Sequence, residues 1–391
     1  VTTAPRICVR YECVPMRFIK HVYKIHTYAQ DGRLFEGKTP VSAFLNSSYD
    51  GSFIAGLMEL RYIQSLPVER IINYFESHGF TLKKPTAHKL MEKASSLFEN
   101  LYKCIRQTAL SDPYKAADET YYKILVPEKN SKGKGVRKGY LWVVVGINTR
   151  MIYLLYDDGS RSERVILNEL GSCKGIIQSD GYSPYRKLES DAYPNITRIP
   201  CLQHIKRKFI DCGEKDPDAK RIVELINALY QNEHKHKVGV EGWTVEQNLM
   251  HRKKYAPDIL GEIKDVFDEI EERGDLLPKS ELQEAITYLR NEWNAVVDIF
   301  NYGDTYLDNN MVERMNRYIS LSRKNSLFFG SHKGAERGAI LYTIALTCRM
   351  HKVNLFEYLT DVINRTAEWQ PNTPIEKYRE LLPDRWEKAN D

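Results

Sequence analysis

The sequence has few cysteines, no long hydrophobic run and no strong charge of either sign, and each absence excludes a class of protein. Seven scattered cysteines in 391 residues do not form a disulfide framework, so we expect a reduced, cytosolic protein. The longest strongly apolar run, Leu141 to Ile147, is far shorter than the ~20 residues of a membrane helix, and no membrane partner is expected. With 42% hydrophobic and 28% charged residues, bulk disorder is excluded as well.

The net charge and the length bound the class of protein further. A formal charge of +5 is compatible with nucleic acid binding but does not require it. At roughly 150 residues per domain, the chain has room for two or three domains, or for one elaborated domain. No signal peptide is visible, although Val1 is not an initiator methionine, so the sequence leaves open an upstream segment.

Residues 46–110 have the pattern of a helix pair. A first helix opens at Leu66-Pro67 and is stopped by His78-Gly79, and Pro85 precedes a second helix over Thr86–Leu101. The second helix is basic, with side chains at Lys83, Lys84, Lys89 and Lys93. Helix, short turn and basic helix form a helix-turn-helix outline, which predicts contact with DNA. The alternative is an ordinary helical pair with a solvated lysine face.

Residues 111–345 carry strands first, and then strands that alternate with helices. Leu141–Val145 is a continuous apolar run, as expected of a strand that is buried on both faces. This order predicts a mixed α/β sheet with carboxylates at the ends of its strands. Residues 215–300 turn helical and highly charged, which we interpret as an insertion into this domain rather than a new one. Residues 346–391 are expected to form a helical tail.

Three acidic residues stand out by their context. Asp118 lies on an expected strand, Asp180 follows a strand that ends at a glycine, and Glu313 lies on a helix that Asp308 is expected to cap. A carboxylate on a helix that faces two carboxylates at the ends of sheet strands can hold Mg²⁺, which prefers oxygen ligands. Two such ions ~3.5–4 Å apart would activate a nucleophilic oxygen and stabilise the leaving oxygen at phosphorus. Spacing alone does not establish this site, since a single aspartate at a strand end is more often a turn or cap residue.

An ordered set of motifs resembles bacterial transposases of the insertion sequence 66 family. The motifs that carry the resemblance are Ala117-Asp118-Glu119-Thr120, Gln178-Ser179-Asp180-Gly181-Tyr182, Cys201–Phe209, Leu277–Ser280, Asp308–Arg314 and Arg323–Ser331. Weaker similarity extends from about residue 15 to the end. Any one motif alone is a weak signal, but the ordered set is specific.

The resemblance implies a DDE transposase with a ribonuclease-H-like mixed sheet and a long helical insertion before the catalytic glutamate. Matched residue by residue, Asp118, Asp180 and Glu313 become the catalytic and metal-binding triad, which would hold Mg²⁺ or Mn²⁺ as two ions. The implied reaction is metal-dependent cleavage at the 3′ ends of an insertion sequence, followed by strand transfer. The implied partners are double-stranded DNA at the element ends and the target, further copies of the chain on DNA, and accessory proteins of the same element. The implied location is the bacterial cytoplasm, in association with the nucleoid.

The resemblance also assigns a role to each region. Residues 1–45 would be the remnant of a truncated DNA-binding region, 46–110 the helix-turn-helix, 111–345 the catalytic core and 346–391 the tail. One departure concerns zinc: relatives carry a cysteine-rich segment, whereas Cys8 and Cys13 lack the paired spacing of a zinc knuckle. No zinc is therefore expected in this fragment.

Two further groups of side chains are expected to contact DNA phosphates, namely His204, Arg207, Lys208, Arg323, Lys324 and Asn325. The first group opens the helix after a core strand, and the second ends the helix of the expected catalytic glutamate. The alternative for the first group is a plain surface helix.

Two other functions remain open at this point. One is a ribonuclease-H-like nuclease that cuts DNA without joining it. The other is a catalytically silent DNA-binding protein derived from a transposase, against which the presence of all three carboxylates argues.

Overall fold

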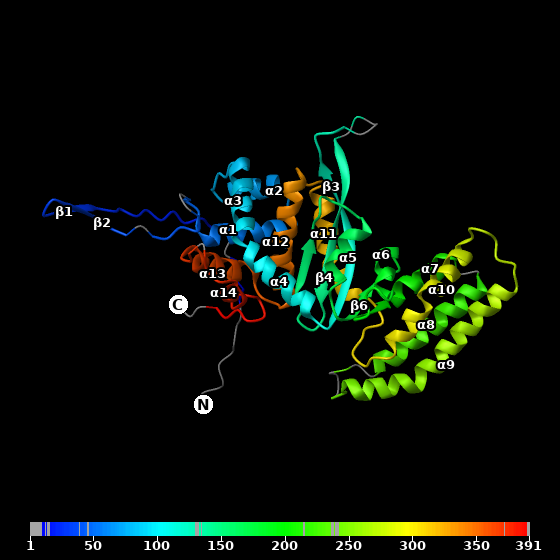
Figure 1. The fold of residues 1–391 in the computed structure, drawn as a ribbon. Coiled ribbons are helices and arrows are strands. Elements are labelled where there is room, and N and C mark those ends of the chain that lie inside the picture. Colours follow the sequence, from blue (N-terminus) through cyan, green and yellow to red (C-terminus); the bar gives the residue numbers. More distant parts are fainter. Residues whose placement is uncertain are drawn as a thin grey trace, which may run out of the picture.

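The computed structural model describes residues 10–388 apart from 12, 14–15, 39, 45–46, 130–132, 134, 214–215, 236–237, 239–241 and 371. Three parts follow one another across the molecule: a helical part with a projecting hairpin, a central sheet, and a group of helices that extends away from the sheet (Figure 1). No helix in these described ranges combines the length and the apolar character needed to cross a membrane.

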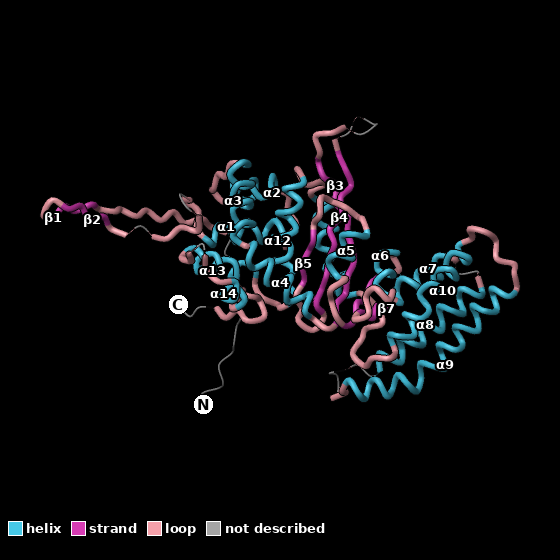
Figure 2. The backbone as a smooth tube through the Cα atoms, in the orientation of Figure 1, coloured by secondary structure: helices cyan, strands magenta, loops and turns pink. Residues whose placement is uncertain are grey.

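The central sheet is mixed and has the strand order β5-β4-β3-β6-β7 (Figure 2). β4 pairs antiparallel with β3 and β5, whereas β6 runs parallel to both β3 and β7. The strands are β3 (Tyr114–Leu125), β4 (Val136–Gly146), β5 (Ile152–Leu155), β6 (Gly175–Ser179) and β7 (Ile196–Pro200). The prediction of a mixed α/β sheet is confirmed. The strand that carries Asp118 and the strand that precedes Asp180 are neighbours.

The apolar run in β4 explains why this strand lies inside the molecule. Leu141–Val145 is almost completely buried, since β4 has a strand on each side and helices pack against the sheet. Trp142 also packs edge-to-face against Tyr185, with 6.1 Å between ring centroids. The helices around the sheet include α4 (Glu99–Ser111), α5 (Glu163–Leu170) and the short α6 (Ser183–Arg186).

Helices from both ends of the chain pack together beside the sheet. α1 (Gly51–Tyr62) contacts α12 (His332–Met350) and α13 (Leu355–Ala367), and α14 (Ile375–Arg379) contacts α4. The expected helix pair corresponds to α2 (Val68–Ser77) and α3 (Lys84–Leu97). The second helix ends four residues earlier than predicted, because buried Phe98 leaves the helical conformation and α4 begins directly after it.

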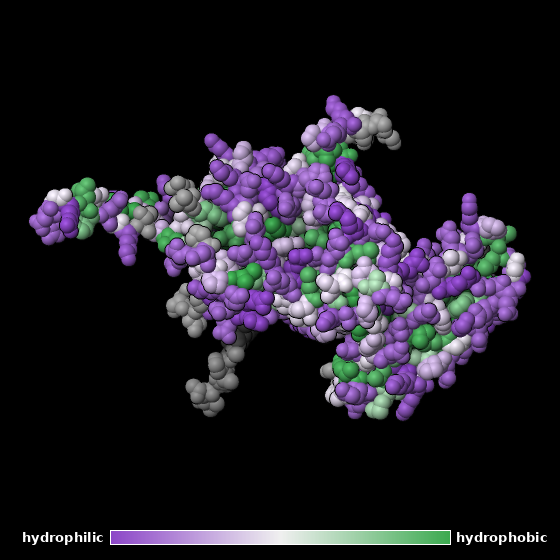
Figure 3. Space-filling model, viewed as in Figure 1, coloured by the Kyte–Doolittle hydropathy of each residue, from purple (hydrophilic) through white to green (hydrophobic). Residues whose placement is uncertain are grey.

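A hairpin projects from this helical part. β1 (Thr27–Gln30) and β2 (Arg33–Glu36) pair across the turn Asp31-Gly32. Both strands are exposed throughout, and the hairpin surface mixes hydrophilic side chains with apolar ones, including the exposed Leu34 and Phe35 (Figure 3).

The chain after β7 is helical and lies outside the sheet. α7 (Leu202–Asp211) follows β7 directly, and the charged segment 215–300 contains α8 (Pro217–Lys235), α9 (Val245–Glu272) and α10 (Glu281–Ile299). None of the described residues of this segment adds a strand to the sheet. α10 packs against α7 and β7. The chain then returns through α11 (Asn310–Asn325), which packs against β3 and so brings Glu313 back to the sheet.

Candidate active site

Asp118 lies on the central strand, where β3 still pairs with β4. Its Oδ1 accepts a hydrogen bond from the backbone N–H of Glu119 at 2.8 Å, and its Oδ2 accepts one from Asn316 Nδ2 at 2.5 Å. Desolvation raises the pKa of Asp118 to about 8, and the nearby charges of Asp180 and Glu119 act in the same direction. The Asp118 and Asp180 carboxylates are therefore close enough for the charge of one to shift the pKa of the other.

Asp180 directly follows β6, at the carboxyl end of two parallel strands. Its Oδ1 accepts from the Tyr182 N–H at 3.1 Å, and its carbonyl accepts from Arg198 Nη2 at 2.6 Å. Any larger residue at position 181 would displace Tyr288, because a Cβ on Gly181 would lie 2.5 Å from the hydroxyl oxygen of Tyr288. The turn after β6 is thus fixed by contacts on both sides of the aspartate.

Glu313 lies in the first turn of α11, on a face that is held against β3. The residue at the N-cap position is Asn309, so the prediction of an Asp308 cap is wrong by one residue. Asp308 instead accepts from the Asn310 N–H at 3.1 Å, while Asn309 Nδ2 donates to the Ala117 carbonyl at 3.1 Å. Asn309 and Asn316, one turn before and one turn after Glu313, therefore both anchor α11 to the strand segment that carries Asp118.

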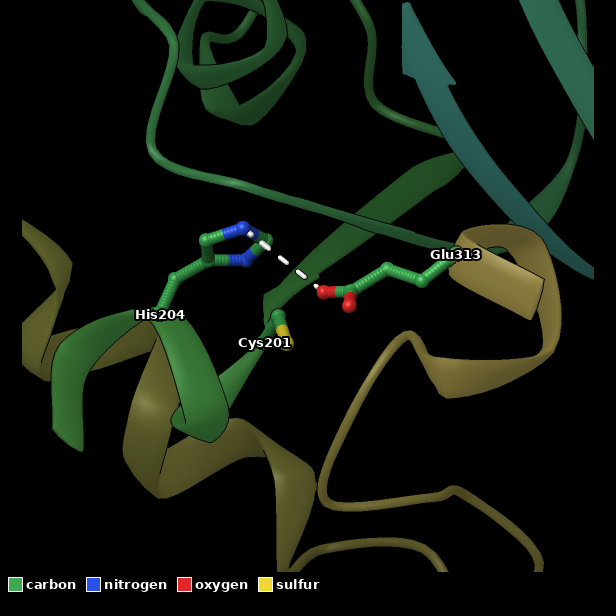
Figure 4. Close-up of side chains that lie close together, drawn as sticks. All are labelled: Cys201, His204 and Glu313. Atoms are coloured by element: carbon green, nitrogen blue, oxygen red, sulfur yellow. Dashed lines mark ion pairs between the residues drawn. The ribbon is translucent and has the colours of Figure 1, made fainter. Parts of the chain in front are cut away.

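His204 faces this site rather than a separate surface (Figure 4). Its Nε2 lies 3.7 Å from Glu313 Oε1, as the dashed line in Figure 4 marks. The ligand atoms of Cys201, His204 and Glu313 lie within 4.8 Å of one another. Among the side chains that the structure describes, the three carboxylates do not bring ligand atoms that close together as a set. Burial raises the pKa of the Cys201 thiol to about 11.

Several acceptor atoms around Glu313 have no hydrogen-bond partner although they are buried. They are Glu313 Oε1, Asn309 Oδ1 and Asn316 Oδ1. Buried acceptors without partners are uncommon in proteins and call for an explanation. Oxygen acceptors that surround carboxylates are the chemistry that a hard divalent cation requires.

Glu119 is adjacent to Asp118 but is engaged elsewhere. Its carboxylate forms an ion pair with Arg161, and the hydroxyl of Tyr185 donates to it at 3.4 Å. The Arg161 guanidinium stacks on the ring of Tyr182, 4.1 Å from its centroid. The charge of Glu119 is therefore balanced by Arg161, unlike the charge of its neighbour Asp118, whose described partners are the Glu119 N–H and the Asn316 amide.

The residues expected to contact DNA differ in how they are held. Arg323 donates to the backbone carbonyl of Tyr121 at 2.5 Å, and its guanidinium lies 3.9 Å from the centroid of the Tyr121 ring. These two contacts hold the end of α11 against β3. Asn325 donates to the Ser65 carbonyl at 3.1 Å. Lys324, Arg207 and Lys208 have exposed side chains.

The lysines around α3 belong to the helical part of the molecule (Figure 1). Lys83 and Lys89 are exposed. Lys84 forms an ion pair with Glu69 at 2.6 Å, and Lys93 Nζ lies 5.5 Å from the centroid of the Phe44 ring. Of the two cysteines considered for zinc, Cys13 is an exposed free thiol, and Cys8 lies outside the described residues.

Sequence reasoning missed the hydrogen bonds that hold the residues around the three carboxylates, which are made by Asn309, Asn316 and Arg198. It named His204 as a contact for DNA phosphates but did not expect it beside Glu313. One signal could have located His204 there: it opens the helix after β7, and the carboxyl ends of parallel strands meet at one edge of a sheet.

Comparison with known proteins decides the family. The family model described as "Transposase IS66 family" matches residues 46–337, which is most of the chain. The chain belongs to the IS66 transposase family. The resemblance in the ordered motifs is therefore confirmed, and all three carboxylates lie within the matched range of this IS66 transposase-family chain.

Relatives of this family member include two uncharacterized proteins of Sinorhizobium fredii (strain NBRC 101917 / NGR234). The chain is 26% identical to y4jD over 346 residues, covering 85% of itself and 65% of y4jD. It is 24% identical to y4hP over 404 residues, covering 97% of itself and 70% of y4hP. The chain thus spans about two thirds of the length of these relatives. A solved structure, the Drosophila P element transposase strand transfer complex, aligns with 77% of the chain at 13% identity and a TM-score of 0.38, covering 93% of that structure's chain.

Proposed function

We propose that this IS66-family chain is a DDE transposase, which cleaves the 3′ ends of an insertion sequence and joins them to target DNA. The observation that carries the proposal is that Asp118, on β3, and Asp180, directly after the parallel neighbour β6, lie close together beside the helix of Glu313. Asn316, one turn after Glu313, is hydrogen-bonded to Asp118 and links the helix to the first carboxylate.

The strand order supports a ribonuclease-H-like core. Three antiparallel strands are followed by two parallel ones, and the first strand of the sheet in the chain is central. The helical insertion lies between β7 and α11, directly before the proposed catalytic glutamate. This architecture is the one that the family resemblance implies.

The residues present fit a magnesium site. Asp118, Asp180 and Glu313 would hold the cations, and the unpartnered oxygens of Asn309 and Asn316 lie next to them. When bound, Mg²⁺ or Mn²⁺ would supply charge neutralisation and activation of the attacking oxygen. With two ions, each held by only some of the carboxylates, the three side chains need not all lie within reach of a single ion. An oxygen donor set favours Mg²⁺ over zinc, which prefers nitrogen and sulfur.

The protein's own contribution is to hold these groups in place. The Glu119 N–H and the Asn316 amide fix both oxygens of Asp118, and the Tyr182 N–H fixes Asp180. Fixed charges and dipoles that are already oriented before the reaction provide most of the catalysis in phosphoryl transfer. His204, beside Glu313, would contact a phosphate that enters the site.

The proposed substrate is double-stranded DNA, at both the element ends and the target. Phosphates would be contacted by the exposed cations Arg207 and Lys208 on α7, by Lys324 on α11 and by the lysines around α3. Synapsis of two ends requires two active sites, so further copies of the chain on DNA belong to the proposal, as do accessory proteins of the same element.

A strand-transfer assay tests the proposed function. A labelled, pre-cleaved element end is incubated with the protein, Mg²⁺ and a target plasmid, and uncleaved ends are tested in parallel. Joined product supports the transposase. Cleavage without joining would identify a nuclease, and DNA binding with neither product would identify a silent DNA-binding protein.

The lysines around α3 provide a separate test of DNA binding. Changing Lys83, Lys84, Lys89 and Lys93 together to Gln should weaken binding and flatten its salt dependence, because each phosphate contact releases counterions. Each lost contact should lower the slope of log K against log salt by about 0.9. A control variant removes the same charge from four exposed lysines elsewhere, at Lys103, Lys352, Lys377 and Lys388. Equal slopes for the two variants would show that the α2–α3 pair is only structural.

A further inference from the structure

The helical insertion contacts the turn that carries Asp180 at two points. The hydroxyl oxygen of Tyr288, on α10, accepts a hydrogen bond from the Gly181 N–H at 2.8 Å. One helical turn further along α10, Glu292 Oε2 lies 2.6 Å from Arg198 Nη1 on β7. Tyr288 and Glu292 therefore point from one face of the insertion toward the end of the sheet where Asp180 lies.

Arg198 connects this ion pair to the residues at the end of β6. Its side chain is fully buried, with Nε donating to Ser179 Oγ at 3.1 Å and Nη2 donating to the Asp180 carbonyl at 2.6 Å. Nη1 also donates to Glu189 at 2.7 Å. One guanidinium thus holds Ser179 and Asp180 at the end of β6, while its charge is balanced by Glu189 and by Glu292 from the insertion.

Burying the Arg198–Glu292 ion pair costs the hydration of both charges, so the pair is stable only in a well-defined geometry. Glu292 has a side-chain exposure of 1%, and its burial raises its pKa although the charge of Arg198 lowers it. Buried ion pairs are weak evidence for stability, and they are better attested as devices that fix one arrangement. At the second contact, the ring of Tyr288 occupies the space that a side chain at position 181 would need.

We propose that Tyr288 and the Arg198–Glu292 pair are positioning residues that orient Asp180, so that the insertion sets the geometry of a proposed metal ligand. This inference rests on the proposed function, since it assumes that Asp180 holds the cation. The insertion would then be an integral part of the active site and not only an additional surface for DNA.

Two conservative variants of the full chain test the inference, Tyr288→Phe and Glu292→Gln. The first removes one hydroxyl and keeps the ring, so it remains informative if the second fails to fold. The matched control is Tyr302→Phe, which removes a hydroxyl that donates to Thr197 Oγ1 at 3.3 Å, near the start of β7 and away from Asp180.

Metal binding is measured directly, with Mn²⁺ alone as the probe and its free concentration read by electron paramagnetic resonance. Partners that orient a metal ligand typically change metal affinity by roughly 10- to 100-fold. We expect Tyr288→Phe to weaken Mn²⁺ binding and to raise the Mg²⁺ concentration for half-maximal DNA cleavage by about tenfold. The Kd for DNA should stay unchanged, and excess Mg²⁺ should restore cleavage.

A purely structural role gives a different result. It would lower the amplitude of cleavage at every Mg²⁺ concentration and leave the midpoint and the Mn²⁺ affinity unchanged, which would overturn the inference. An equal midpoint shift in Tyr302→Phe would overturn it as well.

Asp180→Asn separates this inference from the proposed function. If Asp180→Asn loses Mn²⁺ binding and cleavage while Tyr288→Phe behaves as wild type, the positioning role is wrong and the catalytic assignment stands. If Asp180→Asn binds Mn²⁺ and cleaves DNA normally, the catalytic assignment fails and the positioning role fails with it.

Discussion

Replacing any one of Asp118, Asp180 and Glu313 with its amide is expected to lower Mg²⁺-dependent cleavage and joining together, by about a hundredfold or more. Asn and Gln keep the size and hydrogen-bonding capacity of the side chain but remove the charge that balances the cations. Because loss of a single preorganised electrostatic contact typically costs about 10²–10³ in rate, loss of a metal ligand should cost at least as much. Cleavage and joining of one labelled element end report both steps in a single assay.

The control for these variants is Glu281→Gln. Glu281 lies in the first turn of α10 and is exposed, as an acidic residue near a helix N-terminus in the same manner as Glu313. It therefore corrects for the loss of a favourable charge at a helix N-terminus. DNA binding should persist in all four variants, because phosphates are contacted by lysine and arginine side chains. A carboxylate whose amide variant cleaves at the normal rate does not belong to the active site.

The second large effect is on stability in the absence of divalent metal. Asp118 has a folded-state pKa of about 8, raised from 3.8 mainly by desolvation. A raised carboxyl pKa favours folding of the protonated form, so this contribution is fully present below about pH 4 and is lost as the pH rises toward 8. Each pKa unit by which the folded and unfolded states differ corresponds to about 1.4 kcal/mol of free energy of unfolding. The wild-type protein should therefore lose several kcal/mol of stability between about pH 4 and pH 8.

Asp118→Asn should abolish most of this loss. In EDTA, its free energy of unfolding should exceed that of the wild type at pH 8.5 and match it more closely at pH 5. Urea denaturation at the two pH values measures the difference, and Asp157→Asn, at an exposed aspartate, serves as the control. Saturating Mg²⁺ should restore the free energy of unfolding of the wild type at pH 8.5 and leave that of Asp118→Asn nearly unchanged. A wild type as stable as Asp118→Asn at pH 8.5 in EDTA would contradict the raised pKa.

The sheet and two of its carboxylates could be predicted from the sequence because their signals are local. The apolar run Leu141–Val145 identifies a buried strand, and the glycine after Asp180 marks the end of another. β3 and β6 are parallel neighbours, and the register Ala116↔Gln178 brings Asp118, inside β3, level with Asp180, directly after β6. The charge of Asp180 accordingly helps to raise the pKa of Asp118.

The supporting contacts could not be predicted because they join residues far apart in the chain. Asn316 reaches Asp118 across 198 positions, and Tyr288 reaches Gly181 across 107. No local pattern encodes such pairs, since they depend on how α10 and α11 pack against the sheet. The end of α3 escapes prediction for a related reason: no proline or glycine marks it, and it is the burial of Phe98 that accompanies the break.

The central claim is that Asp118, Asp180 and Glu313 together hold the catalytic cations. The most direct measurement is anomalous scattering from crystals of the full chain grown with Mn²⁺ and element-end DNA. We expect two peaks about 3.5–4 Å apart, bounded by these three carboxylates. A single peak bound by Cys201, His204 and Glu313, with none at Asp118 and Asp180, would contradict the account.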